Sequence, residues 1–197
     1  MFINELFESV IREAREAHSS QLFESVLREA NGNEAKQESE NKAEELIFLE
    51  DLVKMTSVLS TKKSKVIVHK SIGDVRICIG KPSLDSYGLR HIIYKRKDSE
   101  NRTEDEITAM LSLICSAIHD GDPKPDYDCI KVTKNGITAI ITRLVSERGK
   151  IGLLTGYDLD TNKKEATEAI QTVNAQYSST PEYSGLRKQV VAVTSNI

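Results

Sequence analysis

The sequence has no tryptophan and few cysteines, prolines and aromatic residues. It contains three cysteines and four prolines in 197 residues, and 5% of its residues are aromatic. Cys78, Cys115 and Cys129 are odd in number and widely spaced, which fits neither a disulfide framework nor a zinc site. We therefore expect them to be buried as small apolar side chains.

Long apolar runs are also absent. No segment approaches the roughly 18 apolar residues of a membrane-spanning helix, so no membrane span is expected. The first residues are acidic and amphipathic, without the basic start and apolar centre of a signal peptide. Together with 39% hydrophobic and 29% charged residues, these features predict a globular protein of the cytoplasm, unless something else delivers it.

Common ligand-binding motifs are missing too. The chain has no GxxxxGK[ST], GxGxxG, HExxH, CxxC or GxSxG segment. Functions that depend on ATP, a dinucleotide or zinc therefore have no local support. We expect neither a cofactor nor a metal ion.

Positive charge is concentrated in one part of an acidic chain. The net charge is −3, yet residues 57–97 contain 10 basic and 2 acidic residues. The centre of this block is SYGLRHIIYKRK, residues 86–97, where His91 lies among four cations. A local basic surface attracts polyanions whatever the total charge, although solvated lysines on a sheet surface are an equally good explanation of the charge alone.

Residues 1–60 are predicted to form a helical extension. The segment LFESVIREA (6–14) recurs as LFESVLREA (22–30), and both copies have apolar residues at helical spacing. A polar linker (31–45) leads into a helix at residues 43–59. Its expected buried stripe consists of Leu46, Leu49, Leu52, Val53 and Met55.

Residues 61–177 are predicted to form an α+β domain, followed by a tail at 178–197. Strands are expected in KVIVHK and DVRICIG, joined through SIGD, whereas LRHIIYKR fits a strand or a helix. Residues 103–121 predict the clearest helix, with Thr103 and Glu106 as a capping box. Three further strands between 128 and 159, the first two joined by Asn135-Gly136, predict a meander.

A helix at 162–177 and a terminal strand, KQVVAVT, complete the expected secondary structure. The predicted fold class is α+β: N-terminal helices, then an antiparallel sheet with one long helix packed on a face.

His91 is the best candidate for proton transfer, since it lies in the basic block, although a lone histidine is more often structural. Metal-free RNA cleavage requires a base, an acid and cations that stabilise the phosphorane. Arg143 lies in the middle of an apolar strand, and LLTGYD places Thr155 and Tyr157 at a strand end. An outward-facing arginine and ordinary strand-end chemistry explain these residues equally well.

The order of these segments resembles a known nuclease family. A glycine turn into GLRHI, a long amphipathic helix, a meander and LLTGYD together resemble the phage-associated nucleases of the barnase–EndoU–colicin–RelE superfamily (the BECR fold). The resemblance covers about residues 64–170 and excludes residues 1–60. It rests on order and on short signatures.

The resemblance implies that His91 is the catalytic acid or base, Arg143 a phosphate-binding cation, and Thr155 and Tyr157 residues of the active site. Three basic residues would bind substrate: Arg90, Lys95 and Arg96. Many such nucleases have a second histidine a few residues after the first, where this chain reads YKRKDSEN. Lys95 or Arg96 is the candidate to replace it, and loss of activity is the alternative.

The implied function is a metal-independent endoribonuclease that acts as a toxin or a phage-borne effector. Its implied partners are RNA and a cognate inhibitor protein, with no membrane, and the N-terminal helices are candidates for oligomerisation or protein contacts. The alternative is a non-catalytic module that binds nucleic acid or protein.

Overall fold

The structure is a computed structural model that describes residues 37, 41–42, 44–83, 86–143, 151–158 and 163–196. Contacts divide the chain into a first unit, Met1–Leu46, and a second unit, Ile47–Ile197. The few described positions of the first unit are helical. The near-repeat at 6–30 lies outside the described residues, and the following paragraphs concern the second unit.

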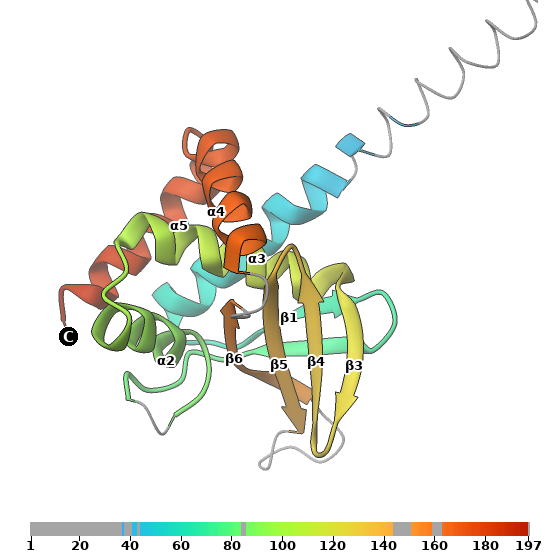
Figure 1. The fold of residues 1–197 in the computed structure, drawn as a ribbon. Helices are drawn as coiled ribbons and strands as arrows, with labels where there is room; N and C mark the ends of the chain where they lie inside the picture. The colour runs from blue at the N-terminus through green and yellow to red at the C-terminus, as the bar shows by residue number, and fades with distance from the viewer. Residues whose placement is uncertain are drawn as a thin grey trace, which may run out of the picture. The chain divides into compact units, whose positions relative to one another are not determined.

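A six-stranded sheet organises the second unit (Figure 1), with strand order β1-β2-β6-β5-β4-β3. The strands are β1 (Lys65–His69), β2 (Gly73–Ile77), β3 (Asp122–Asp126), β4 (Cys129–Lys134), β5 (Ile137–Arg143) and β6 (Ile151–Asp158). Strands β2 and β6 pair in parallel, and the other neighbours are antiparallel. The sheet is therefore mixed, which corrects the expected antiparallel sheet. The long crossover between β2 and β6 makes their parallel pairing feasible.

The turns of the sheet follow the glycine signals of the sequence. Asn135 and Gly136 have φ of 51° and 71°, so both central residues of the β4–β5 hairpin are left-handed, as predicted. Gly73 closes the β1–β2 hairpin with φ of 78°. Strand β3 was not predicted, because it contains Pro123 and Pro125. Its edge position explains why the prolines are tolerated.

The helices of the second unit gather on one side of the sheet (Figure 1). Residues 47–61 are helical, and four α-helices and a π-helical turn follow in chain order: α2 (Leu89–Tyr94), η1 (Lys95–Ser99), α3 (Glu104–Asp120), α4 (Lys163–Tyr177) and α5 (Pro181–Thr194). Thr103 and Glu106 form the predicted capping box of α3. Among the described residues, no helix is long and apolar enough to cross a membrane.

The predicted terminal strand KQVVAVT is wrong, because these residues belong to α5. Thr180 accepts a hydrogen bond from the Tyr183 amide as N-cap, and Pro181 follows at the first helical position. Tyr183, Leu186 and Val190 are spaced as one helical face and are buried. Local β propensity was therefore overridden by packing of this face.

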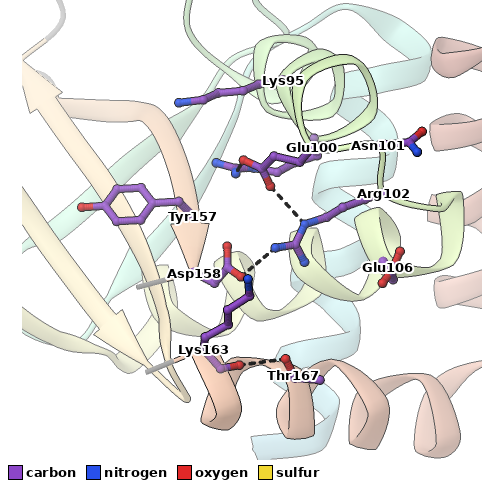
Figure 2. Close-up of a pocket in the computed structure, with 10 residues that line it drawn as sticks. Lys95, Glu100, Asn101, Arg102, Glu106, Tyr157, Asp158, Lys163 and Thr167 are labelled. Atoms are coloured by element: carbon purple, nitrogen blue, oxygen red, sulfur yellow. Dashed lines mark hydrogen bonds and ion pairs between the residues drawn. The ribbon is translucent and has the colours of Figure 1, made fainter. Parts of the chain in front are cut away.

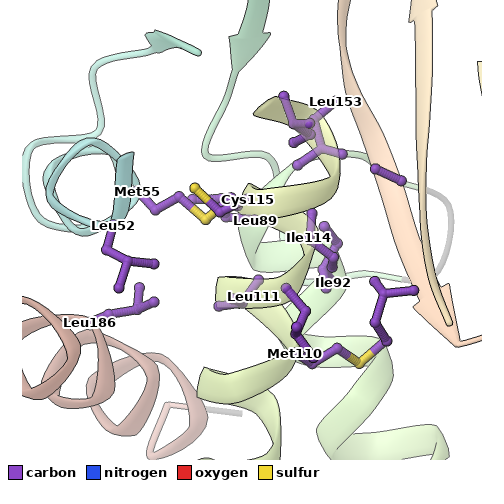
Figure 3. Packing of buried hydrophobic residues seen from close by; sticks show 14 of the residues in the cluster. Leu52, Met55, Leu89, Ile92, Met110, Leu111, Ile114, Cys115, Leu153 and Leu186 are labelled. Carbon is purple, nitrogen blue, oxygen red and sulfur yellow. The ribbon is translucent and has the colours of Figure 1, made fainter. Parts of the chain in front are cut away.

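Helix α3 lies at the centre of the hydrophobic core, and most of its residues are buried. Figure 3 shows Leu52, Met55 and Leu186 gathered beside it. The predicted stripe of the helix at 43–59 is only partly right. Leu52 and Met55 are fully buried, whereas Leu46 and Val53 are 64% and 52% exposed.

Candidate functional site

A polar pocket of about 690 Å³ lies where η1, the end of β6 and the start of α4 meet (Figure 2). Its lining is almost entirely charged or hydrogen-bonding: Lys95, Arg96, Glu100, Asn101, Arg102, Glu106, Tyr157, Asp158, Lys163 and Thr167. We call it the polar pocket. Three of its residues, Lys95, Arg96 and Tyr157, are candidates that the sequence predicted.

The segment from α2 to α3 brings its cations to the pocket in one tight connection. Helix α2 continues into η1 without a break, and its apolar side is buried. The chain then turns at Asn101, whose φ is 52°, and the Arg102 amide donates to the Arg96 carbonyl at 3.0 Å. The capping box at Thr103 starts α3 immediately afterwards. Arg96 and Arg102 are thereby fixed near each other.

Arg96 is a buried cation with protein partners. Its side chain is 3% exposed, it donates from Nη2 to the Gly156 carbonyl at 2.8 Å, and it forms an ion pair with Glu100. Burial lowers the pKa of Arg96 to about 10. The guanidinium therefore remains charged at neutral pH and is used to hold β6 and η1 together.

Arg102 bridges two carboxylates of the pocket. It donates from Nε to Glu100 at 3.0 Å and from Nη2 to Asp158 at 2.6 Å. Burial alone raises the pKa of Asp158, but the hydrogen bond and charge of Arg102 outweigh it and hold that pKa below its ordinary value. Asp158 is therefore charged at neutral pH, and both carboxylates are paired with arginine.

The third carboxylate, Glu106, is used by the α3 cap. It accepts from the Thr103 amide at 2.8 Å and from the Thr103 hydroxyl at 2.9 Å, and these two bonds lower the pKa of Glu106. By contrast, the Lys95 ammonium, the Tyr157 phenol and the Lys163 ammonium have no hydrogen-bond or ion-pair partner within the part of the chain that the structure describes. The polar pocket therefore presents two free cations and a hydroxyl donor, which suits an anion.

Figure 2 shows how these free groups lie. In this view Lys95 and Lys163 lie on either side of Tyr157 and Asp158, and Arg102 reaches Asp158 from the other wall. The two lysines come from η1 and α4, which are far apart in the sequence.

His91 lies one turn before Lys95 and is not among the residues that line the polar pocket. Residues four apart share one side of a helical run, so the two side chains start from the same side. His91 is 6% exposed, and its Nδ1 lies 2.8 Å from the Ser83 carbonyl. Because a carbonyl only accepts, Nδ1 carries hydrogen. Nε2 then remains available, and it has no partner among the described residues.

Thr155 and Tyr157 are two residues apart on β6 and therefore point to the same face of the sheet. The Thr155 hydroxyl is buried and lacks a hydrogen-bond partner among the described atoms. Tyr157 lines the polar pocket and Thr155 does not. The predicted pair thus shares a face, while one member reaches the pocket.

Arg90 and Arg143 lie elsewhere. Arg90 is half-buried on α2, with an Nε that has no partner among the described atoms. The side chain of Arg143 lies outside the described residues, and its backbone pairs with Ile151, whereas Thr138 pairs with Tyr157. Thr138 and Arg143 are five residue steps apart along β5, a distance of about 17 Å. The predicted phosphate-binding role of Arg143 therefore stays a prediction.

Sequence reasoning assigned none of the other seven lining residues to a site, among them Glu100, Arg102, Asp158 and Lys163. Asp158 ends the LLTGYD segment, in which Thr155 and Tyr157 are the predicted site residues. Arg102 precedes the predicted cap of α3, so its place was readable but its partner was not. Nothing in the local pattern distinguishes Lys163 from its neighbour Lys164.

His69 and His119 have structural partners, and His18 lies outside the described residues. His69 lies 3.1 Å from the Gly121 carbonyl through Nε2, and its Nδ1 accepts from two backbone amides. The bond to the Gly121 carbonyl joins the end of β1 to the residue that precedes β3. His119, in the last turn of α3, lies 3.5 Å from the buried Asp51.

The three cysteines are free thiols and differ in burial. Cys115 is buried, and burial raises the pKa of its thiol. Cys78 and Cys129 are partly exposed, so the expectation of burial holds for Cys115 only. Within the described ranges, no group of three or more His, Cys, Asp or Glu side chains is arranged to hold a metal ion.

Comparison with known proteins adds no identification. The chain matches no protein-family model, no curated protein and no solved structure. The function must therefore be argued from the residues of the polar pocket.

Proposed function

We propose that the second unit is a metal-independent endoribonuclease that binds an RNA phosphate in the polar pocket. The observation that carries the proposal is that the side-chain polar groups of Lys95, Tyr157 and Lys163 lack partners in the described chain. They lie beside carboxylates that are paired with arginine or hydrogen-bonded in the α3 cap. Cations and hydroxyl donors are the groups that bind phosphate oxygens.

The proposed reaction is attack of a ribose 2′-oxygen on the adjacent phosphorus, with release of the 5′-oxygen. His91 Nε2 takes the 2′-hydroxyl proton, Tyr157 donates a proton to the leaving oxygen, and Lys95 stabilises the phosphorane charge. The Ser83 carbonyl keeps the hydrogen of His91 on Nδ1, which leaves the Nε2 lone pair for this step. Lys95 thus fills the role of the second histidine of the resembling nucleases.

The resemblance to BECR-fold nucleases supports this assignment through the order of segments. Under the proposal the protein acts on cytoplasmic RNA as a toxin or a phage-borne effector, and a cognate inhibitor protein is an expected partner. Arg90, Arg143 and Thr155 belong to the proposal as substrate-binding or active-site residues.

A second function is a non-catalytic module that binds nucleic acid through the same pocket. The observation that favours it is the position of His91, which is 6% exposed and outside the pocket lining. A binding module needs the free lysines and has no need of a proton-transfer group.

Incubation of the full chain with labelled single-stranded RNA in EDTA separates the two functions. The nuclease proposal predicts cleavage products ending in a cyclic phosphate, lost in His91→Ala and strongly reduced in Lys95→Ala. Equal cleavage by wild type and His91→Ala would refute the role of His91. RNA binding that weakens with salt, without any cleavage by the wild type, would establish the binding module instead.

A further inference from the structure

Three carboxylates line the polar pocket, which is unusual for a pocket that binds anions. Glu100, Glu106 and Asp158 face the same space as Lys95 and Lys163. An unneutralised carboxylate a few ångströms from a phosphate repels it. Any anion site here therefore depends on what neutralises the acids.

One residue contacts two of these acids. Arg102 bonds Glu100 through Nε and Asp158 through Nη2, and its side chain is 18% exposed. Figure 2 shows it between them. Arg96 also pairs with Glu100, and its charge acts on Asp158 from nearby, but within the described ranges Asp158 forms its ion pair with Arg102. Without Arg102, Asp158 would be a half-buried charge next to the free Tyr157 phenol.

We propose that Arg102 is the residue that makes the polar pocket select anions, because it neutralises Asp158 and, with Arg96, Glu100. The inference deepens the proposed function and rests on it for RNA as the ligand. It applies to any phosphate group in the pocket. Arg102 acts through the carboxylates and needs no contact with the ligand.

Removal of the two charges, singly and together, tests this role. In Arg102→Gln, Asp158 loses its ion-pair partner. Its carboxylate then repels the bound phosphate, and we expect phosphate affinity to fall by about tenfold or more, although salt partly screens the repulsion. In Arg102→Gln combined with Asp158→Asn, the repelling charge is absent and binding returns to within about threefold of wild type. Asp158→Asn alone is expected to bind at least as tightly as wild type.

Two probes keep the inference separate from the ribonuclease proposal. Inorganic phosphate is titrated into the full chain and followed by amide NMR shifts of residues 95–102 and 157–158. An RNA oligonucleotide with 2′-O-methyl groups, which cannot be cleaved, is followed by fluorescence anisotropy. Phosphate binding without RNA binding supports the inference and refutes RNA as the ligand.

Salt distinguishes repulsion from a folding defect. The loss of phosphate affinity in Arg102→Gln, relative to wild type, should become smaller as salt rises from about 0.05 to 0.5 M. Salt screens a charge repulsion but does not repair a misfolded pocket. Failure of the double variant to recover binding, at a temperature where circular dichroism shows it folded, overturns the inference. Absence of phosphate binding by the wild type overturns it as well.

Discussion

Gly156→Ala is predicted to destabilise the second unit, because β6 lies directly against α3. A Cβ at this position would lie 2.4 Å from Ile114 Cδ1 and 2.7 Å from Ile114 Cγ1. Ile114 is fully buried, so its side chain has to shift within the packed core. Forcing a methyl group into such a core costs about 1–3 kcal/mol. The smaller entropy of the unfolded alanine variant offsets about 0.4–1 kcal/mol of this.

Gly185→Ala is the matched control, since it makes the same chemical change on α5. Its Cβ would lie 3.7 Å from the nearest atom, Thr56 Cγ2, which is ordinary contact. Alanine in a helix interior is favoured over glycine by about 0.8–1 kcal/mol. Urea unfolding followed by circular dichroism should therefore shift in opposite directions for the two variants. A Gly156→Ala protein stabilised as much as Gly185→Ala would refute the close packing of β6 on α3.

Three further predictions follow from single contacts. Thr103→Ala removes the N-cap of α3 and should lower the free energy of unfolding by about 1 kcal/mol, measured in urea. Asp158 has a pKa below its unfolded value, so its stabilisation is full above about pH 4 and is lost as the pH falls through the folded pKa. Acid unfolding should thus be less steep in Asp158→Asn than in wild type, and an unchanged profile would contradict the Arg102 bond. Lys163→Ala should weaken RNA binding several-fold with little change in thermal stability, because the Lys163 side chain is exposed and its ammonium has no partner among the described residues.

The sequence predicts those elements whose causes are local. The capping box needs two residues three apart, and the left-handed hairpin needs an adjacent Asn135-Gly136 pair, so both were readable. The place of β6 beside β2 in the sheet could not be predicted, because this parallel pairing is decided by contacts between distant segments. Helix α5 was missed for the same reason, since its buried face needs α3 to pack against.

The candidate site also combines residues that local patterns predict with residues that only distant contacts bring together. Lys95, Arg96 and Tyr157 were found from a basic block and a strand-end motif, and they share one pocket. The sequence could not tell that Arg96 is buried against Gly156 while Lys95 is free. The bond from Arg102 to Asp158 joins residues 56 apart, and such a pair leaves no local pattern.

The central claim is that the free lysines of the polar pocket bind RNA phosphate. Lys163 and Lys164 are neighbours at the start of α4, but only Lys163 lines the pocket, while Lys164 lies 3.9 Å from Glu168. The most direct measurement is the salt dependence of RNA affinity in Lys163→Ala and Lys164→Ala. We predict a weaker affinity and a salt slope reduced by about one for Lys163→Ala, with Lys164→Ala close to wild type. Equal affinities and slopes in the two variants would contradict the claim.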